Sequence, residues 1–110
     1  MNQYLLIESR DCFESKDVEY CYDLAKDLAS SGNKVTLYLI QNGVLPTRRT
    51  SMINGRLSDL AKSHVDVYAD DFSLRERAIP SSALADGIRV SNIDTLVDLL
   101  MSDGTKAIWH

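Results

Sequence analysis

The sequence predicts an α/β fold, a three-layer α/β/α arrangement around a mainly parallel five-stranded sheet. Short apolar runs, typical of strands buried on both faces, alternate along the chain with segments of helical period. Alternating strands and helices require right-handed crossovers, which place helices on both faces of a parallel sheet. The length of 110 residues and the hydrophobic share of 45% suit a single globular domain over residues 1–110.

The five strands are predicted from runs of apolar and β-branched residues. Residues 4–8 and 34–40 are the longest, and each is a nearly continuous apolar run. The other three strands are shorter and cover residues 65–68, 88–90 and 106–109. A polar loop through Pro46 is expected after the second strand.

Helices are predicted between these strands. The first begins at Asp17, with Ser15 or Asp17 as its cap, and Gly32 supplies a left-handed end. A capping box that starts at Ser73 and ends at Glu76 opens a brief third helix. The second helix carries one mainly apolar face, which consists of Leu57, Leu60, Ala61 and His64. The last helix is capped within residues 91–94 and is expected to bury the stripe Ile93, Leu96, Val97, Leu100 and Met101.

Composition excludes several classes of function. The net charge of -4 and the pI near 5.0 disfavour nucleic acid and anionic membrane surfaces as partners. No stretch approaches the ~20 apolar residues of a membrane span, and residues 1–8 lack the features of a signal peptide. Cys12 and Cys21 fit a reducing cytoplasm, and no spacing of Cys and His predicts a metal. A glycine-rich nucleotide loop and a serine elbow are also missing, so no cofactor is expected.

The predicted topology selects the loops that can hold a ligand. Ligands of open parallel sheets bind beyond the carboxyl ends of the strands. Cys12 follows the first strand and is the candidate catalytic residue, because it is a thiol at this edge. The candidate ligand-binding residues follow the other strands, and they are Asn42, Arg48, Arg49, Asp71, Ser73 and His110.

Several of these candidates also have a simpler structural interpretation, and for Cys12 it is an ordinary loop cysteine. The start of a helix near Cys12 lowers a thiol pKa, whereas the carboxylates of Asp11 and Glu14 oppose ionisation. Arg48 and Arg49 can hold an anion such as sulfate, thiosulfate or phosphate, or can belong to a solvated loop or a subunit contact. Asp71 fits the start of a helix, and His110 can be a mobile terminal residue.

Four segments resemble the DsrE/DsrF-like sulfur-relay family. They are residues 4–8 (YLLIE), 35–44 (VTLYLIQNGV), 67–77 (VYADDFSLRER) and 106–109 (KAIW), so the likeness spans nearly the whole chain. The resemblance implies a DsrE/F-like subunit that assembles as a homotrimer or homohexamer. In some members of the family a cysteine after the third strand carries sulfur as a persulfide. That position falls near Tyr68 or Ala69 here, and neither side chain can form a persulfide.

Three functions follow from these observations. The leading one is a homo-oligomeric binding or assembly protein of the sulfur-relay type, without persulfide chemistry, which binds a small anion or a relay partner protein. The second is a sulfurtransferase or sulfur carrier that uses Cys12 as the persulfide acceptor. The third is a flavodoxin-like binder of a nucleotide or anion, which the missing glycine loop disfavours.

Overall fold

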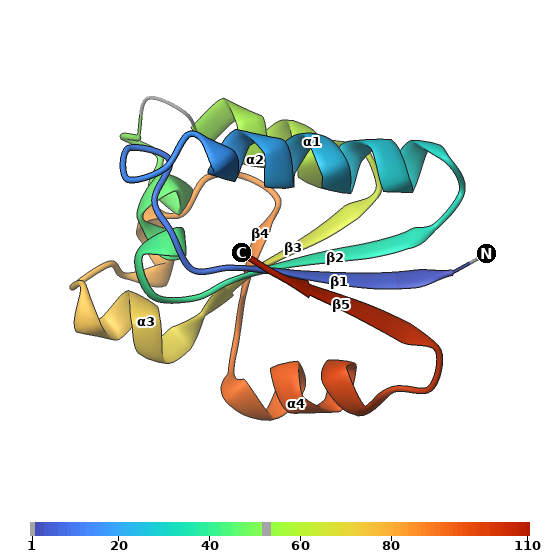
Figure 1. Ribbon diagram of the computed structural model, residues 1–110. Coiled ribbons are helices and arrows are strands. Elements are labelled where there is room, and N and C mark those ends of the chain that lie inside the picture. The colour runs from blue at the N-terminus through green and yellow to red at the C-terminus, as the bar shows by residue number, and fades with distance from the viewer. Residues whose placement is uncertain (1, 52–53) are drawn as a thin grey trace.

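The computed structural model describes residues 2–51 and 54–110 and contains one parallel sheet. In the described residues the sheet has five strands in the order β4-β3-β2-β1-β5, every neighbouring pair parallel (Figure 1). The predicted α/β class and parallel sheet are therefore confirmed. The strands are β1 (Gln3–Glu8), β2 (Lys34–Leu39), β3 (Val65–Asp70), β4 (Ile88–Ser91) and β5 (Thr105–Trp109).

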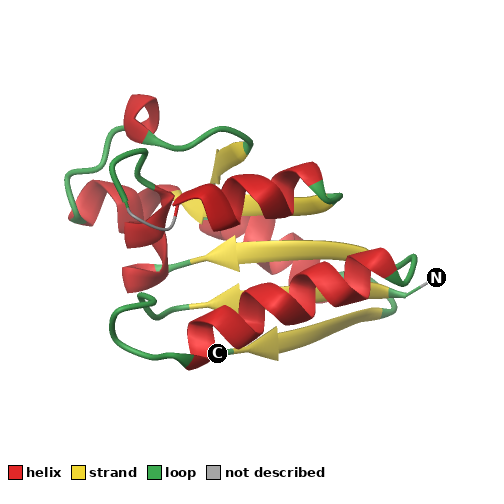
Figure 2. Ribbon diagram, turned by 90° about the horizontal axis from the view of Figure 1, so that it is seen from above, coloured by secondary structure: helices red, strands yellow, loops and turns green. Residues whose placement is uncertain are grey.

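Helices cover the two faces of the sheet unequally. α1 (Asp17–Ser30) and α2 (Asn54–Lys62) lie side by side on one face, and α4 (Ile93–Met101) lies on the other (Figures 1 and 2). The short α3 (Asp71–Glu76) follows β3 directly. Two 3-10 helices, η1 (Gln41–Thr47) and η2 (Ser81–Ala83), complete the described elements. No helix in the described ranges is long and apolar enough to cross a membrane.

The core is divided by the sheet into a large and a small cluster. Because side chains alternate along a strand, Leu6 and Leu37 face α1 and α2, while Leu5, Ile7 and Tyr38 face α4. The large cluster contains side chains such as Val18, Tyr22, Leu57 and Leu60. In the small cluster the buried members are Leu5, Ile7, Tyr38 and Leu96.

Local structure follows the predictions in part. α1 begins at Asp17 as predicted, but its N-cap is Lys16, which makes no side-chain cap hydrogen bond, so the predicted cap at Ser15 or Asp17 is wrong. The Asp17 backbone N–H donates to the Ser15 hydroxyl at 3.2 Å, and Gly32 has the expected left-handed φ of 86°. The predicted capping box at Ser73 is wrong. α3 begins earlier, because the Asp70 carboxylate accepts the Ser73 backbone N–H and thus caps the helix itself. His64 lies beyond the end of α2.

The polar loop expected after the second strand is also different. Residues Gln41–Thr47 coil into η1, although Pro46 lies within it. Gly43 brings η1 against the end of β1, since a Cβ there would collide with the Glu8 carbonyl oxygen.

The prediction that α4 buries a stripe of five apolar residues is wrong at every position except Leu96. Leu96 is buried against the sheet, whereas Ile93 is 60% exposed and Met101 is 78% exposed. Val97 and Leu100 are exposed as well. The helix is apolar over two adjacent arcs, and the sheet covers only the arc that carries Leu96. Periodicity identifies an apolar face but not which arc of a broad face meets the sheet.

Candidate functional site

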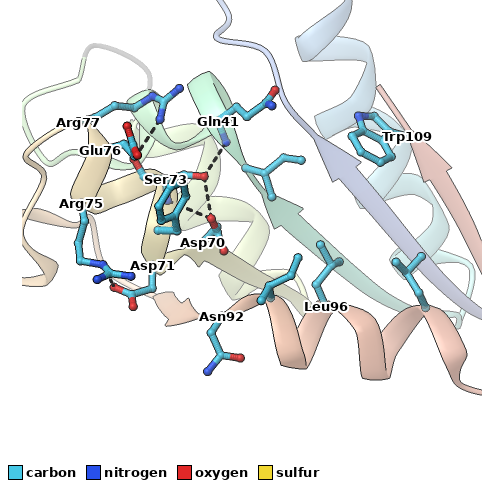
Figure 3. Close-up of a pocket in the computed structure, with 14 residues that line it drawn as sticks. Gln41, Asp70, Asp71, Ser73, Arg75, Glu76, Arg77, Asn92, Leu96 and Trp109 are labelled. Atoms are coloured by element: carbon cyan, nitrogen blue, oxygen red, sulfur yellow. Dashed lines mark hydrogen bonds and ion pairs between the residues drawn. The ribbon is translucent and has the colours of Figure 1, made fainter.

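A groove of about 860 Å³ lies at the carboxyl edge of the sheet, between α3 and α4 (Figure 3). We call it the edge groove. Its position agrees with the rule that parallel sheets bind ligands beyond the carboxyl ends of their strands. The lining residues come from η1, α3, α4 and the ends of β2, β3 and β5. They include Ile40, Gln41, Asp70, Ser73, Ile93, Leu96, Leu100 and Trp109.

One wall of the edge groove is a polar network. The Asp70 carboxylate accepts hydrogen bonds from the backbone N–H of Ser73 at 3.0 Å and from its hydroxyl at 2.7 Å. The Ser73 hydroxyl in turn accepts the Gln41 backbone N–H at 2.8 Å. This network joins α3 to the start of η1 and fixes the shape of the wall.

The charged side chains of this wall contact protein groups. The Arg77 guanidinium donates to the Asn42 side-chain oxygen at 2.9 and 3.1 Å and to the Ser73 carbonyl at 3.1 Å. Arg75 pairs with Asp71 at 3.5 Å, one turn away on the same short helix. These contacts hold the two guanidinium groups against protein oxygens and leave less of their bonding capacity for a small anion.

The opposite wall is apolar. Ile40 and Leu96 line the groove beside the sheet, and Ile93 and Leu100 line it from α4. Trp109 is 68% exposed at the end of β5. Such a lining favours an apolar or aromatic group over a hydrated ion.

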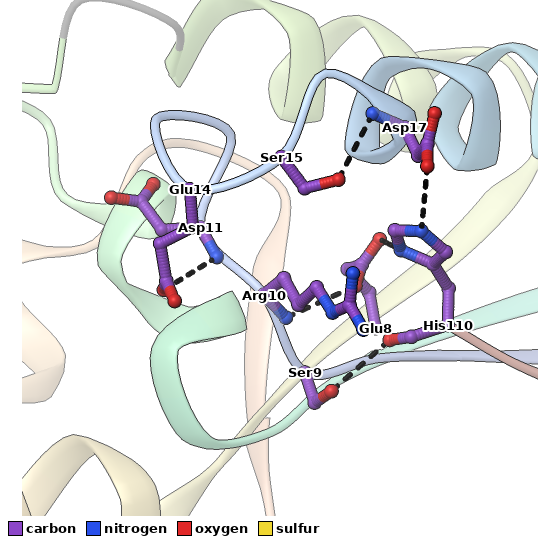
Figure 4. A network of polar contacts seen from close by, with 8 residues as sticks. All are labelled: Glu8, Ser9, Arg10, Asp11, Glu14, Ser15, Asp17 and His110. Carbon is purple, nitrogen blue, oxygen red and sulfur yellow. Dashed lines mark hydrogen bonds and ion pairs between the residues drawn. The ribbon is translucent and has the colours of Figure 1, made fainter.

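A second polar cluster lies between β1 and β5, where the direction of strand order changes (Figure 4). The Glu8 carboxylate is fully buried, and its Oε1 lies 2.7 Å from His110 Nδ1. A carboxylate only accepts, so Nδ1 carries the hydrogen of this bond. Glu8 Oε2 accepts the Arg10 backbone N–H at 3.0 Å, and the His110 carbonyl accepts the backbone N–H and the hydroxyl of Ser9. Asp17 lies 3.9 Å from His110 Nε2. The cluster therefore ties β5 to β1.

The structure places the two cysteines outside the edge groove and keeps both protonated. Burial, with the hydrogen bond from Cys12 Sγ to the Asp11 carboxylate, raises the pKa of Cys12 to about 11. Cys21 lies in the buried stripe of α1, and desolvation raises its pKa to about 12. Burial also raises the pKa of Tyr22, whose hydroxyl has no hydrogen-bond partner among the described residues. Neither thiol is a thiolate at neutral pH, which is the form that attacks sulfur donors.

The arginine pair lies apart from the edge groove. Arg48 Nε donates to the Leu45 carbonyl and Arg49 Nε to the Leu84 carbonyl, each at 2.9 Å. Both arginines border a separate cavity of about 290 Å³ beside residues 78–83. Of the predicted site residues, Asp71 and Ser73 line the edge groove, and Asn42 contacts it through Arg77. Cys12, Arg48, Arg49 and His110 do not line it.

Glu8 is the functional candidate that the sequence analysis missed. A signal was present, because Glu8 is a charged residue at the end of an otherwise apolar strand. Buried charges occur in proteins mainly where they are paired. The partner itself, His110, is 102 residues away, and no local pattern indicates the contact.

Tyr68 and Ala69, the residues that the sequence resemblance matches to a persulfide cysteine, are packed against other side chains. The centroid of the Tyr68 ring lies 6.0 Å from that of the Tyr38 ring, and the Arg89 guanidinium lies 6.0 Å from the Tyr68 ring centroid. Ala69 is fully buried in the large cluster. In the described part of the chain, no group of three or more His, Cys, Asp or Glu side chains is arranged to hold a metal ion.

Comparison with known proteins supports the fold. The chain matches no protein-family model and no curated protein. A protein of unknown function from Methanobacterium thermoautotrophicum, MTH1491, has a TM-score of 0.87 and 19% identity over 100% of both chains. The ychN protein of E. coli has a TM-score of 0.88 and 18% identity over 100% of both chains. A protein of unknown function from Bacteroides thetaiotaomicron, BT1422, has a TM-score of 0.77 and 14% identity, covering 98% of this chain and 95% of that one. At these identities the likeness shows a shared fold over the whole chain.

Proposed function

We propose that this chain is a homo-oligomeric binding protein of the DsrE-like sulfur-relay type that does not itself carry sulfur as a persulfide. In this proposal the edge groove holds a segment of a relay partner protein or a small ligand. The protein acts in the cytoplasm, where free thiols such as those of Cys12 and Cys21 persist.

The observation that carries the proposal is the chemistry of the edge groove. Among its lining residues there is no thiol, and neither Tyr68 and Ala69 within β3 nor the residues that follow β3 include a cysteine. The pKa of Cys12 near 11 leaves a thiolate fraction on the order of 0.1% or less at neutral pH. A groove with an apolar wall and a fixed polar wall is suited to binding, and it lacks a nucleophile for sulfur transfer.

The test is intact mass spectrometry after brief exposure of the native protein to a limiting amount of polysulfide near pH 7.5. We expect no stoichiometric gain of sulfur. The same protein treated in denaturant serves as the positive control, because unfolding removes the burial that raises both thiol pKa values.

Two single variants separate this proposal from the sulfurtransferase alternative. If the native protein gained one sulfur atom per chain, and Cys12→Ser abolished the gain while Cys21→Ser kept it, the proposal would be wrong and Cys12 would be the acceptor. If the unmodified chain, Cys12→Ser and Cys21→Ser all fail to gain sulfur under native conditions, the result supports the proposal.

A further inference from the structure

One side of the exposed surface of α4 is apolar, and Asp94 and Asp98 occupy the exposed arc next to it. Ile93, Val97 and Met101 recur every fourth residue and are all exposed. We call these three residues the α4 row. The outward face of α1, the equivalent layer on the other side, is more polar: charged residues such as Glu19, Asp23 and Lys26 surround the exposed Tyr20 and Leu24. Helices that face only water are usually polar on that side, so the α4 row indicates a contact surface.

The apolar surface continues from the α4 row to the edge groove. Leu100 adjoins the row on α4 and, with Ile93, Phe72 and Trp109, lines the groove. Six partly exposed apolar side chains at roughly 100 Å² each make a patch of about 600 Å², above the few hundred Å² usual for an isolated apolar patch. This area is close to the ~800 Å² that each partner contributes to a standard interface.

The spacing of the α4 row fits a second copy of the same helix. The row is symmetric about Val97, with an apolar residue four positions before it and four after it. If two α4 helices pack antiparallel about a two-fold axis at Val97, then Val97 meets its own copy and Ile93 meets Met101 of the other chain. An isologous contact requires this self-complementarity. Asp94 and Asp98 lie beside the row, at the rim of such a contact, where solvent screens their charges.

We propose that the α4 row is a two-fold interface between copies of this chain, and that the second copy covers the part of the edge groove that adjoins the row. The inference rests on the homo-oligomeric part of the proposed function and specifies its partner and surface. Because Ile93 lies in both the row and the groove lining, the second copy covers the groove beside it. Two-fold pairing of every subunit requires an even number of subunits.

The first test uses native mass spectrometry of the full chain and of Val97→Glu. Glutamate is a better helix former than valine, so the change places two like charges at the two-fold axis without weakening the helix. We expect an even subunit count for the unmodified chain and at least about a tenfold weaker association for Val97→Glu. Tyr20→Glu is the matched control, because Tyr20 is 73% exposed on α1, on the opposite face. It should leave the subunit count unchanged.

The second test uses disulfide cross-linking to determine which residues of the two α4 helices lie opposite each other. Val97→Cys should give a covalent dimer with its own copy under mild oxidation. Met101→Cys alone should give much less, and a mixture of Met101→Cys with Ile93→Cys should restore the dimer. The unmodified chain controls for Cys12 and Cys21.

Several results would overturn the inference. They are a monomer at concentrations on the order of 10 μM, an odd subunit count, dissociation by Tyr20→Glu but not by Val97→Glu, or no cross-link from Val97→Cys. None of them affects the polysulfide experiment, which reads the thiols of each chain separately. A monomer would contradict both the interface and the homo-oligomeric part of the proposed function, but the conclusion that the chain does not carry a persulfide would stand or fall on the polysulfide experiment alone.

Discussion

Replacing His110 by alanine tests whether the cluster between β1 and β5 stabilises the fold. The change removes the Nδ1 group that lies 2.7 Å from the Glu8 carboxylate. Glu8 is fully buried, and its other oxygen accepts only the Arg10 backbone N–H among the described residues. His110→Ala thus leaves a buried carboxylate oxygen without its partner.

The expected cost follows from burial. Hydrogen bonds to charged groups contribute about 1.5–3 kcal/mol, and removing one partner of a fully buried pair costs about 3–5 kcal/mol. The His110 side chain is 26% exposed, so water can replace the imidazole in part. We therefore expect His110→Ala to lower the free energy of unfolding by about 2–3 kcal/mol.

Urea unfolding followed by far-ultraviolet circular dichroism measures this loss. The midpoint should fall without a change in the slope m. His110→Asn is the matched control, since its amide nitrogen occupies nearly the place of Nδ1 and should recover much of the loss. A cycle with Glu8→Gln should give a coupling energy above about 0.5 kcal/mol. The reasoning would be refuted if His110→Ala cost less than about 0.5 kcal/mol, or if asparagine were no better than alanine.

Two further predictions concern η1 and the loop before α1. Gly43→Ala should destabilise the protein by about 1–3 kcal/mol in thermal unfolding, because its Cβ would collide with the Glu8 carbonyl. Gly55→Ala, at a helical position where a Cβ meets nothing within 4 Å, should stabilise by up to about 1 kcal/mol, and equal effects would contradict this account. The raised pKa of Cys12, about 11 instead of 9.0, means about a hundredfold less thiolate at neutral pH. The greater nucleophilicity of a more basic thiolate offsets part of this, so a disulfide reagent should react roughly tenfold more slowly than with a free thiol. Asp11→Asn should speed the reaction, because Asp11 helps raise that pKa. Because the folded pKa exceeds the unfolded value, the stability linked to this proton is present below pH 9.0 and is lost as the pH rises through about 11.

The strands could be predicted because their signal is local. Residues 4–8 and 34–40 are apolar on both faces, and the structure buries Leu5 with Leu6, and Leu37 with Tyr38, on opposite sides of the sheet. The orientation of α4 could not be predicted in the same way. Its sequence is apolar over more than one arc, and the arc that packs depends on how much of the sheet the helix covers.

The candidate site could be predicted only as an edge of the sheet. The loop after β2 coils into η1, and a β-bridge from Arg48 to Leu84 with a hydrogen bond from the Arg49 N–H to the Ala83 carbonyl holds the arginines beside η2. These backbone contacts join segments about 35 residues apart, and composition does not encode them. The rule that ligands bind at the carboxyl edge of a parallel sheet therefore predicted where the groove lies. Which residues line the groove could be seen only in the tertiary structure.

The pairing of β5 with β1 has a consequence for the order in which the molecule opens. Glu8 and His110 are 102 residues apart, so this contact closes a much longer loop than the β1–β2 pairing does. Long-range closure is entropically costly and forms late in folding. α4, which precedes β5, is anchored to the sheet by one buried side chain, Leu96, and by the partly buried Leu99. The α4–β5 segment is consequently the subglobal unit expected to detach first, and its amide protons should exchange with solvent before those of β2 and β3.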